Sequence, residues 1–123
     1  WFTGAHGVLT EVFWPTIDTP QVRDSQILAT DGSSFFFEER KDSVTTVEWL
    51  GRGIPAFKVT NVERNSRFKI ERTLFTDPSN DALVQRVRIT RNVAGLKFFV
   101  LHNPSAGNTP MGNSALARAS GDK

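Results

Sequence analysis

Three carboxylates lie near an aromatic pair in the first quarter of the chain, and they are the first residues whose types could support chemistry. They are Glu11, Asp18 and Asp24, and the pair is Phe13-Trp14. Two carboxyl groups facing each other across a cleft, one with a raised pKa, could act as general acid and general base. The local pattern instead places Glu11 on a strand face and both aspartates in turns, where Asp is common. We therefore expect no catalytic residue in this chain.

The three tryptophans offer a second kind of chemistry, because flat aromatic faces complement sugar rings and bury large areas. Core packing is the competing interpretation, and it is favoured for Trp49, which lies in an alternating apolar segment. For Trp1, sugar stacking and core packing both stay open. Trp14 precedes Pro15 where a strand enters an irregular loop, and tryptophan is enriched at interfaces. The candidates for contact with carbohydrate or with another domain are Phe13, Trp14, Asp18, Arg23 and Asp24, with an ion pair between Asp24 and an arginine such as Arg23 as one option.

Metal, nucleophile and phosphate sites have little support in the residue spacing. His6 and His102 are far apart, and no His, Asp and Glu cluster has the spacing of metal ligands. No Ser-His-Asp arrangement with an elbow motif is present. The segment 77–81 could offer oxygens to Ca²⁺, but it lacks the EF-hand order and a distal Glu. The segment 4–7 is typical of a hairpin turn rather than a phosphate cradle, because no helix follows it. We expect no cofactor, while a structural Ca²⁺ stays open as an alternative for which no ligands can be assigned.

Composition narrows the class of partner. The 123 residues carry a formal net charge of +2, contain no cysteine, and include no apolar run long enough for a bilayer span. A basic stripe is conceivable on Arg86, Arg88 and Arg91 with Lys69 and Arg72 nearby, but alternating arginines on a strand usually form a solvated face. No aromatic residues interleave for base stacking. We therefore expect neither a nucleic-acid nor a membrane partner.

The elements that must position these residues are almost all strands. Alternation of period two and frequent turn signals predict about eight short strands and no convincing helix, which is typical of an antiparallel all-β sandwich. Asp31-Gly32 is a strong hairpin signal. Residues 16–24 read as an irregular crossing. The expected strands cover residues 8–14, 26–30, 34–40, 44–50, 56–63, 68–75, 83–90 and 96–102.

One domain is expected, with residues 1–102 as an antiparallel β-sandwich portion and residues 103–123 as a loop-like tail leading into strands beyond it. The tail is rich in Gly, Asn, Ser, Ala and Pro and has no apolar period. The run Phe35-Phe36-Phe37 at a hairpin offers apolar surface and free edges that a complete sandwich would cover. We therefore expect an incomplete portion of a larger sandwich, with self-association of the isolated chain as a consequence.

Residues 1–24 closely resemble a known domain. The pattern comprises Gly-x-x-Gly-Val-Leu-Thr-Glu-Val at 4–12, the aromatic pair with Pro15, Asp-Thr-Pro at 18–20 and Arg-Asp at 23–24. This pattern is similar to the N-terminal domain of bacterial glycoside hydrolase family 15, which includes glucoamylases and glucodextranases. Asp77-Pro78 and the segment 83–87 fit as well. The pair Phe13-Trp14 stands where tyrosines are common in the family, and residues 102–104 depart from its pattern.

The resemblance implies a large antiparallel β-sandwich (supersandwich-like) that precedes an (α/α)₆ barrel. In the family, the barrel hydrolyses α-glucans from the non-reducing end with inversion, using two carboxyl groups about 6.5–9.5 Å apart. Both carboxylates belong to the barrel, so the resemblance implies a non-catalytic accessory domain that packs on a catalytic domain of the same polypeptide. The alternative is an independent polysaccharide-binding β-sandwich. The linkage of the glucan, α-1,4 or α-1,6, and the compartment of the protein, secreted or cytoplasmic, stay open.

Overall fold

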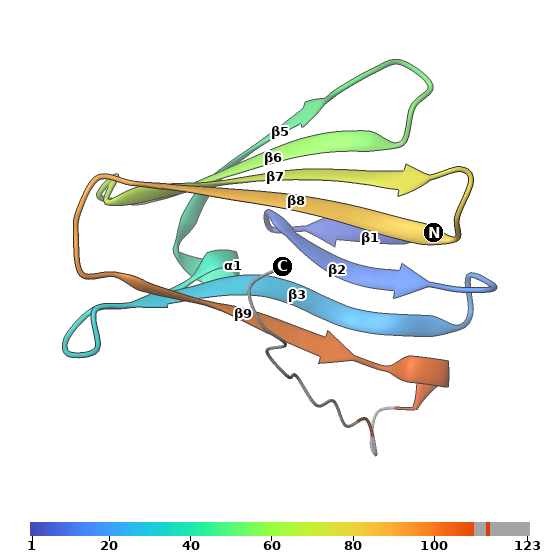
Figure 1. Cartoon of the computed structure of the whole chain (residues 1–123), viewed down its shortest axis with the longest axis horizontal. Coiled ribbons are helices and arrows are strands. Elements are labelled where there is room, and N and C mark those ends of the chain that lie inside the picture. The colour runs from blue at the N-terminus through green and yellow to red at the C-terminus, as the bar shows by residue number, and fades with distance from the viewer. Residues whose placement is uncertain (110–112, 114–123) are drawn as a thin grey trace, which may run out of the picture.

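The computed structural model describes residues 1–109 and 113, and within them the chain forms nine strands, a short α-helix and a 3₁₀ turn (Figure 1). The strands are β1 (Phe2–Ala5), β2 (Val8–Phe13), β3 (Pro20–Thr30), β4 (Phe36–Glu38), β5 (Ser43–Trp49), β6 (Ala56–Glu63), β7 (Phe68–Asp77), β8 (Ala82–Arg91) and β9 (Lys97–Pro104). The helix α1 is Glu39–Asp42 and the 3₁₀ turn η1 is Ala106–Asn108.

The strands form two antiparallel sheets that face each other, which confirms the expected all-β sandwich (Figure 1). Sheet B has the order β5-β6-β7-β8. In sheet A, β1 pairs with β2, and β2 and β4 follow one another along one edge of β3. Strand β9 pairs along the opposite edge of β3 over most of its length. The long strand β3 is therefore the centre of sheet A.

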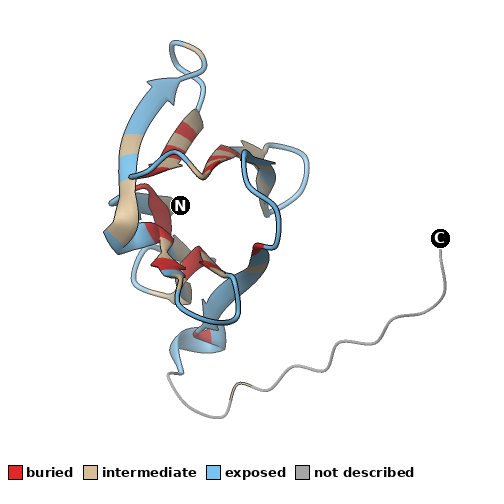
Figure 2. Cartoon of the chain, turned by 90° about the vertical axis from the view of Figure 1, so that its left-hand side faces the viewer, coloured by how far each residue is buried: buried red, intermediate tan, exposed pale blue. Residues whose placement is uncertain are grey.

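The hydrophobic core lies between the sheets, where the alternating strands turn their apolar sides inward. Figure 2 shows the buried segments lining the space between the two layers. Phe68 is at the centre of the core, with its ring centroid 4.8 Å from that of Phe37 and 5.1 Å from that of Phe98, both edge-on. The buried core cluster comprises Ile27, Ala29, Phe37, Phe68, Ile70 and Leu96.

A buried ion pair joins the two layers beside this core. Glu39 and Arg72 have side chains that are 0% and 2% exposed. The Arg72 guanidinium donates to both carboxylate oxygens of Glu39, with 2.9 Å from Nε to Oε1, and its Nη1 donates to Gln85 Oε1 at 2.8 Å. The backbone N–H of Ile27 in sheet A also donates to Glu39 Oε2, at 2.6 Å. The pair thus connects strands of both sheets.

Asn61 extends the same polar network to the first hairpin. Its Nδ2 donates to Glu39 Oε1 at 2.7 Å and to the carbonyl of Gly7 at 2.8 Å. Its Oδ1 accepts a hydrogen bond from Thr45 Oγ1 at 2.7 Å. Asn61 is fully buried, so these bonds satisfy a polar side chain that would otherwise be costly to bury.

Two expectations are wrong at this network. The strand expected over residues 34–40 ends at Glu38, and Glu39–Asp42 form the single turn α1, in which the Asp42 carboxylate accepts from the Glu38 N–H at 2.8 Å and Glu39 is buried. Arg72 was grouped with a possible basic stripe. It lies instead on the inner face of β7 with Ile70 and Leu74, which the alternation of that strand requires.

The segment 16–24 is also more regular than expected, because β3 begins at Pro20. The first half of β3 is paired on both edges, since Val22 lies opposite Val12 of β2 and Pro104 of β9. Backbone hydrogen bonding therefore overrides the turn signals of the local sequence. Strand β9 runs to Pro104, two residues past the expected end of the sandwich portion. Of the expected tail, residues 110–112 and 114–123 lie outside the described residues.

The turn between β1 and β2 consists of His6 and Gly7, with φ values of 51° and 76°, as in the two-residue hairpin turns that require positive φ. The predicted hairpin turn at 4–7 is thus confirmed, although its first strand, β1, was not expected. A Cβ atom at Gly7 would lie 2.3 Å from Asn61 Oδ1 and 2.6 Å from Thr45 Oγ1. Glycine is therefore required here for its backbone and for its size.

We expect Gly7→Ala to destabilise the chain more than Gly95→Ala does. Both residues have positive φ, which costs an L residue about 1–2 kcal/mol, but nothing lies within 4 Å of a Cβ at Gly95. Overpacking against Asn61 adds about 1 kcal/mol or more at Gly7 only. Urea unfolding of both variants measures the difference, and equal losses would show that the hairpin does not press on Asn61.

Candidate functional site

The corner Phe13-Trp14-Pro15 lies at the end of β2, and its geometry is fixed by backbone hydrogen bonds. The Trp14 N–H donates to the Thr19 carbonyl at 3.1 Å, and the Trp14 carbonyl accepts from Gln21 Nε2 at 2.7 Å. The Trp14-Pro15 peptide is cis. The Trp14 residue is 52% exposed, so the loop is closed by its backbone while the indole is left open to solvent.

Trp14 lines a groove with a volume of about 600 Å³. We call this surface the aromatic groove. Four of its eight lining residues are aromatic, two are prolines, and the other two are the polar residues Thr76 and Asp81. The chain segments around it come from β1, from the loop after β2, from the β5–β6 and β7–β8 connections and from strands β6 and β7. Its lining residues are Trp1, Phe2, Trp14, Pro15, Pro55, Phe57, Thr76 and Asp81.

Phe13 borders a smaller hollow beside the aromatic groove, with a volume of about 150 Å³. The residues that line both spaces are Trp1, Phe2, Trp14, Thr76 and Asp81, and Asp77 lines the hollow only. The two candidate aromatic residues predicted from the sequence are therefore brought to one side of the molecule.

Trp49 is exposed by 63%, so the expectation that it packs in the core is wrong. It lies opposite Phe57 on the inner face of sheet B, and the ring centroids are 5.3 Å apart. Its Nε1 donates to the Ile54 carbonyl at 2.9 Å. At this end, β5 diverges from sheet A (Figure 1), which agrees with the exposure of Trp49. The alternation of the strand correctly predicted that Trp49 lies on the inner face of sheet B. Whether a residue on that face is buried depends on how the two sheets pack.

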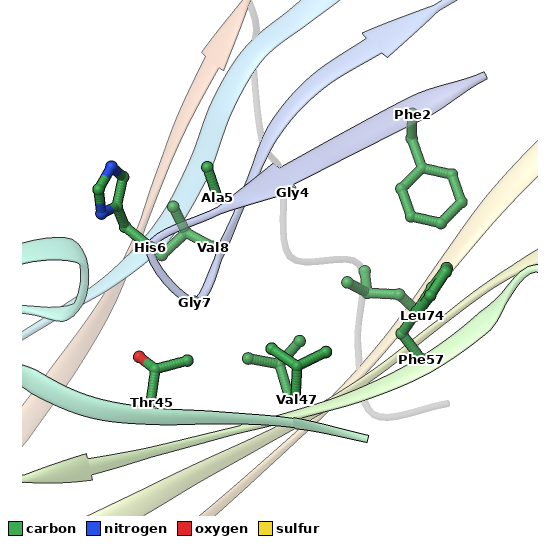
Figure 3. A pocket seen from close by; sticks show the side chains of 11 residues that line it. Phe2, Gly4, Ala5, His6, Gly7, Val8, Thr45, Val47, Phe57 and Leu74 are labelled. Atoms are coloured by element: carbon green, nitrogen blue, oxygen red, sulfur yellow. The ribbon is translucent and has the colours of Figure 1, made fainter. Parts of the chain in front are cut away.

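A mostly apolar cavity of about 390 Å³ adjoins the aromatic groove under the first hairpin (Figure 3). Phe2 and Phe57 line both spaces, and their ring centroids are 6.1 Å apart in an edge-on arrangement. Val47 and Leu74 of sheet B lie on the far side from the hairpin (Figure 3). An aromatic surface thus continues from Trp14 through Phe2 and Phe57 to Trp49.

Asp18 does not line the aromatic groove. Its Oδ1 accepts hydrogen bonds from the hydroxyls of Thr16 and Thr19 within its own loop. The Thr16 hydroxyl is the main cause that lowers the pKa of this carboxyl below its usual range. Asp18 is therefore ionised at neutral pH and serves to close the loop that carries Trp14.

Arg23 and Asp24 lie in β3, beside β9, rather than at the aromatic groove. Arg23 Nε donates to Ser105 Oγ at 3.4 Å. Within the described part of the chain, no ion pair involves Arg23 or Asp24, and Asp24 Oδ1 is a buried atom without a hydrogen-bond partner. The five candidate residues therefore lie in three places: Phe13 and Trp14 at the smaller hollow and the aromatic groove, Asp18 in the loop between β2 and β3, and Arg23 and Asp24 in β3.

The carboxylates considered for acid-base chemistry are dispersed over the fold. Glu11 is exposed on β2 and accepts a hydrogen bond from Thr3 at 3.4 Å, while Asp18 is in a loop and Asp24 is in β3. Among residues 1–109 and 113, no three His, Asp or Glu side chains lie together as a group that could hold a metal ion. In the segment 77–81, Asp77 accepts from the Ser79 N–H and from Asn80 Nδ2, and the Asn80 bond chiefly lowers the pKa of Asp77.

The arginines of β8 lie on a surface of mixed charge. Arg86 and Arg88 flank Glu71 on the outer face of sheet B, and Lys69 and Lys58 lie 3.2 and 3.7 Å from that carboxylate. Lys69 is the main cause of the lowered pKa of Glu71. The described helices include none long and apolar enough to cross a membrane.

Sequence reasoning missed the groove residues that come from distant elements, which are Phe2, Pro55, Phe57, Thr76 and Asp81. The position of Phe57 could have been found, because the expected strands 44–50 and 56–63, joined through residues 51–55, pair residue 49 with residue 57. Asp81 offered no such signal, since the approach of the β7–β8 turn to Trp14 depends on how the two sheets pack.

Comparison with known proteins gives consistent matches. Residues 1–123 match the family described as glucodextranase, domain N. The chain is 31% identical over 111 residues to a glucoamylase from Clostridium sp. (strain G0005), across 88% of this chain and 16% of that protein. It superposes on a crystal structure of a bacterial glucoamylase complexed with acarbose with a TM-score of 0.82 and 31% identity, again across 88% of this chain and 16% of the other. The chain thus spans 16% of the length of these relatives.

Proposed function

The chain belongs to the family of glucodextranase N-terminal domains, and from this premise we propose that it is a non-catalytic accessory domain of an inverting α-glucan exo-hydrolase. The resemblance drawn from residues 1–24 is confirmed by the family match. In the proposal, the domain packs on a separate (α/α)₆ catalytic domain of the same polypeptide and supports it, and the α-glucan is the substrate of that catalytic domain.

The observation that carries the proposal is the match of the whole chain to an N-terminal domain, combined with its 16% share of the glucoamylases it resembles. The dispersal of Glu11, Asp18 and Asp24 over three parts of the fold agrees with a domain that leaves the acid-base chemistry to another one. Inverting hydrolysis requires two carboxyl groups about 6.5–9.5 Å apart across a substrate cleft.

We propose that the outer face of sheet A is the surface that contacts the catalytic domain. Phe36, Phe99 and Leu101 lie on this face and are 64%, 53% and 43% exposed. The register places Phe99 opposite Leu28 and Phe36 opposite Thr30, so the side chains are neighbours across the centre of the sheet. Contiguous exposed apolar side chains on a folded domain mark a surface that binds protein.

We expect the purified chain to release no glucose from maltotriose or isomaltotriose. A full-length enzyme of the family, assayed under the same conditions, is the positive control. Release of glucose by the chain alone, abolished by a single substitution such as Glu11→Gln or Asp24→Asn, would contradict the accessory role.

A further inference from the structure

We propose that the aromatic groove binds a segment of a glucan chain, with pyranose rings stacking on Trp14 and neighbouring rings and with hydroxyl groups donating to Asp81. The identification of the sugar as a glucan rests on the proposed function. The existence of a sugar site rests on the groove itself, and such a site would give this chain a contact of its own with the polysaccharide.

A pyranose ring has flat faces of C–H groups and an edge of hydroxyl groups, so its site needs both aromatic faces and hydrogen-bond acceptors. The aromatic groove provides both. Trp1 and Trp14 line it and are 67% and 52% exposed, and Thr76 and Asp81 lie in the same wall. Its volume of about 600 Å³ falls within the range of known small-molecule sites, which combine aromatic walls with a few polar groups.

The carboxylate favours a sugar over an apolar protein surface as the occupant. Asp81 is exposed, and among the described residues its side chain has no ion pair and no hydrogen-bond partner. Covering it with an apolar protein surface would remove its water without replacing the hydrogen bonds, which is costly for a charged group. Sugar hydroxyls replace those bonds directly. The outer face of sheet A, in contrast, presents Phe36, Phe99 and Leu101 as an apolar surface suited to protein contact.

The backbone that carries Trp14 is also fixed before any ligand binds. Hydrogen bonds from the Trp14 N–H to Thr19 and from Gln21 to the Trp14 carbonyl fix the loop before any ligand binds. Asp18 closes the same loop through the Thr16 and Thr19 hydroxyls. A loop fixed in this way loses little backbone conformational entropy on binding, which favours affinity.

The test is isothermal titration calorimetry of the chain with maltoheptaose and, separately, with isomaltoheptaose, so that the two linkages are distinguished. We expect saturable binding of at least one sugar. Trp14→Ala should weaken it about tenfold, the effect of losing one stacked aromatic contact. Asp81→Ala should weaken it as well. Phe99→Ala is the matched control, because it removes an equally exposed ring (53% against 52%) outside the groove and should leave the affinity unchanged.

Circular dichroism melting of each variant shows whether it is folded, and Trp14→Phe gives a second reading because a smaller ring should retain part of the affinity. The inference would be overturned if neither sugar bound at millimolar concentration. Binding that is equally weakened by Phe99→Ala, or unchanged in both Trp14→Ala and Asp81→Ala, would also overturn it. The proposed accessory role is judged separately by association with the catalytic domain, so either proposal can fail without the other.

Discussion

Glu39→Ala is expected to lower the free energy of unfolding of the chain by about 3–5 kcal/mol, the usual effect of breaking a buried ion pair from one side. The change leaves the Arg72 guanidinium, which is 2% exposed, without its countercharge in the space between the sheets. It also removes the acceptor for the Ile27 N–H and for Asn61 Nδ2. Urea denaturation followed by circular dichroism measures the loss.

The matched control is Glu48→Ala, because Glu48 also pairs with a basic residue but at 3.9 Å and with a side chain that is 68% exposed. Exposed pairs of this kind contribute about 0–1 kcal/mol. If Glu39→Ala does not fold, Glu39→Gln keeps one acceptor and gives a smaller, measurable loss. A second test replaces both charged residues with methionine, since an apolar pair of similar volume often restores stability to a buried site.

A loss below about 1 kcal/mol for Glu39→Ala would contradict the role assigned to the pair. So would a double methionine variant that is less stable than Glu39→Ala, because neither variant has the ion pair and only Glu39→Ala keeps a buried, unpaired Arg72. In the expected case, the pair specifies how the sheets align rather than adding net stability over an apolar core.

Most of the strands were predictable from the sequence because their pairing is local. The alternation of residues 56–63 and 44–50 gave β6 within its observed bounds and β5 within one residue at each end. Hairpin turns such as Asp31-Gly32 are equally local, since the Asp31 carboxylate accepts from the Ser33 and Phe35 N–H groups. The start of β3 was missed, because Pro20 and Asp24 have turn propensities that pairing with β2 and β9 overrides.

The candidate site was predictable only in part, for a different reason. Pro15 after Trp14 indicated a strand end, and an exposed indole at that corner follows from it. The burial of Arg72 and the exposure of Trp49 depend on how the two sheets pack, with a carboxylate from α1 beside the first residue and the divergence of β5 from sheet A at the second (Figure 1). The groove as a whole requires the β7–β8 turn to approach Trp14, which no local pattern encodes.

Phe99→Ala is expected to weaken binding between the chain and a separately expressed catalytic domain by about 30-fold, since truncating an interface anchor costs about 2 kcal/mol or more. The ring is 53% exposed on the outer face of sheet A beside Leu101 and Leu28, so it can enter a partner without unfolding the chain. Thr46→Ala is the control, because Thr46 is exposed on the outer face of sheet B. Surface plasmon resonance with the immobilised catalytic domain measures both variants.

The same face accounts for the expected self-association of the isolated chain, because Phe36, Phe99 and Leu101 remain uncovered when no catalytic domain is present. Sedimentation equilibrium should therefore show weaker self-association for Phe99→Ala than for the unmodified chain, and the catalytic domain should compete with it. Trp14→Ala should leave both equilibria unchanged, because its ring lines the aromatic groove and not this face. If Trp14→Ala abolished binding to the catalytic domain while Phe99→Ala did not, the aromatic groove would be the domain interface and the assignment of the two surfaces would be reversed.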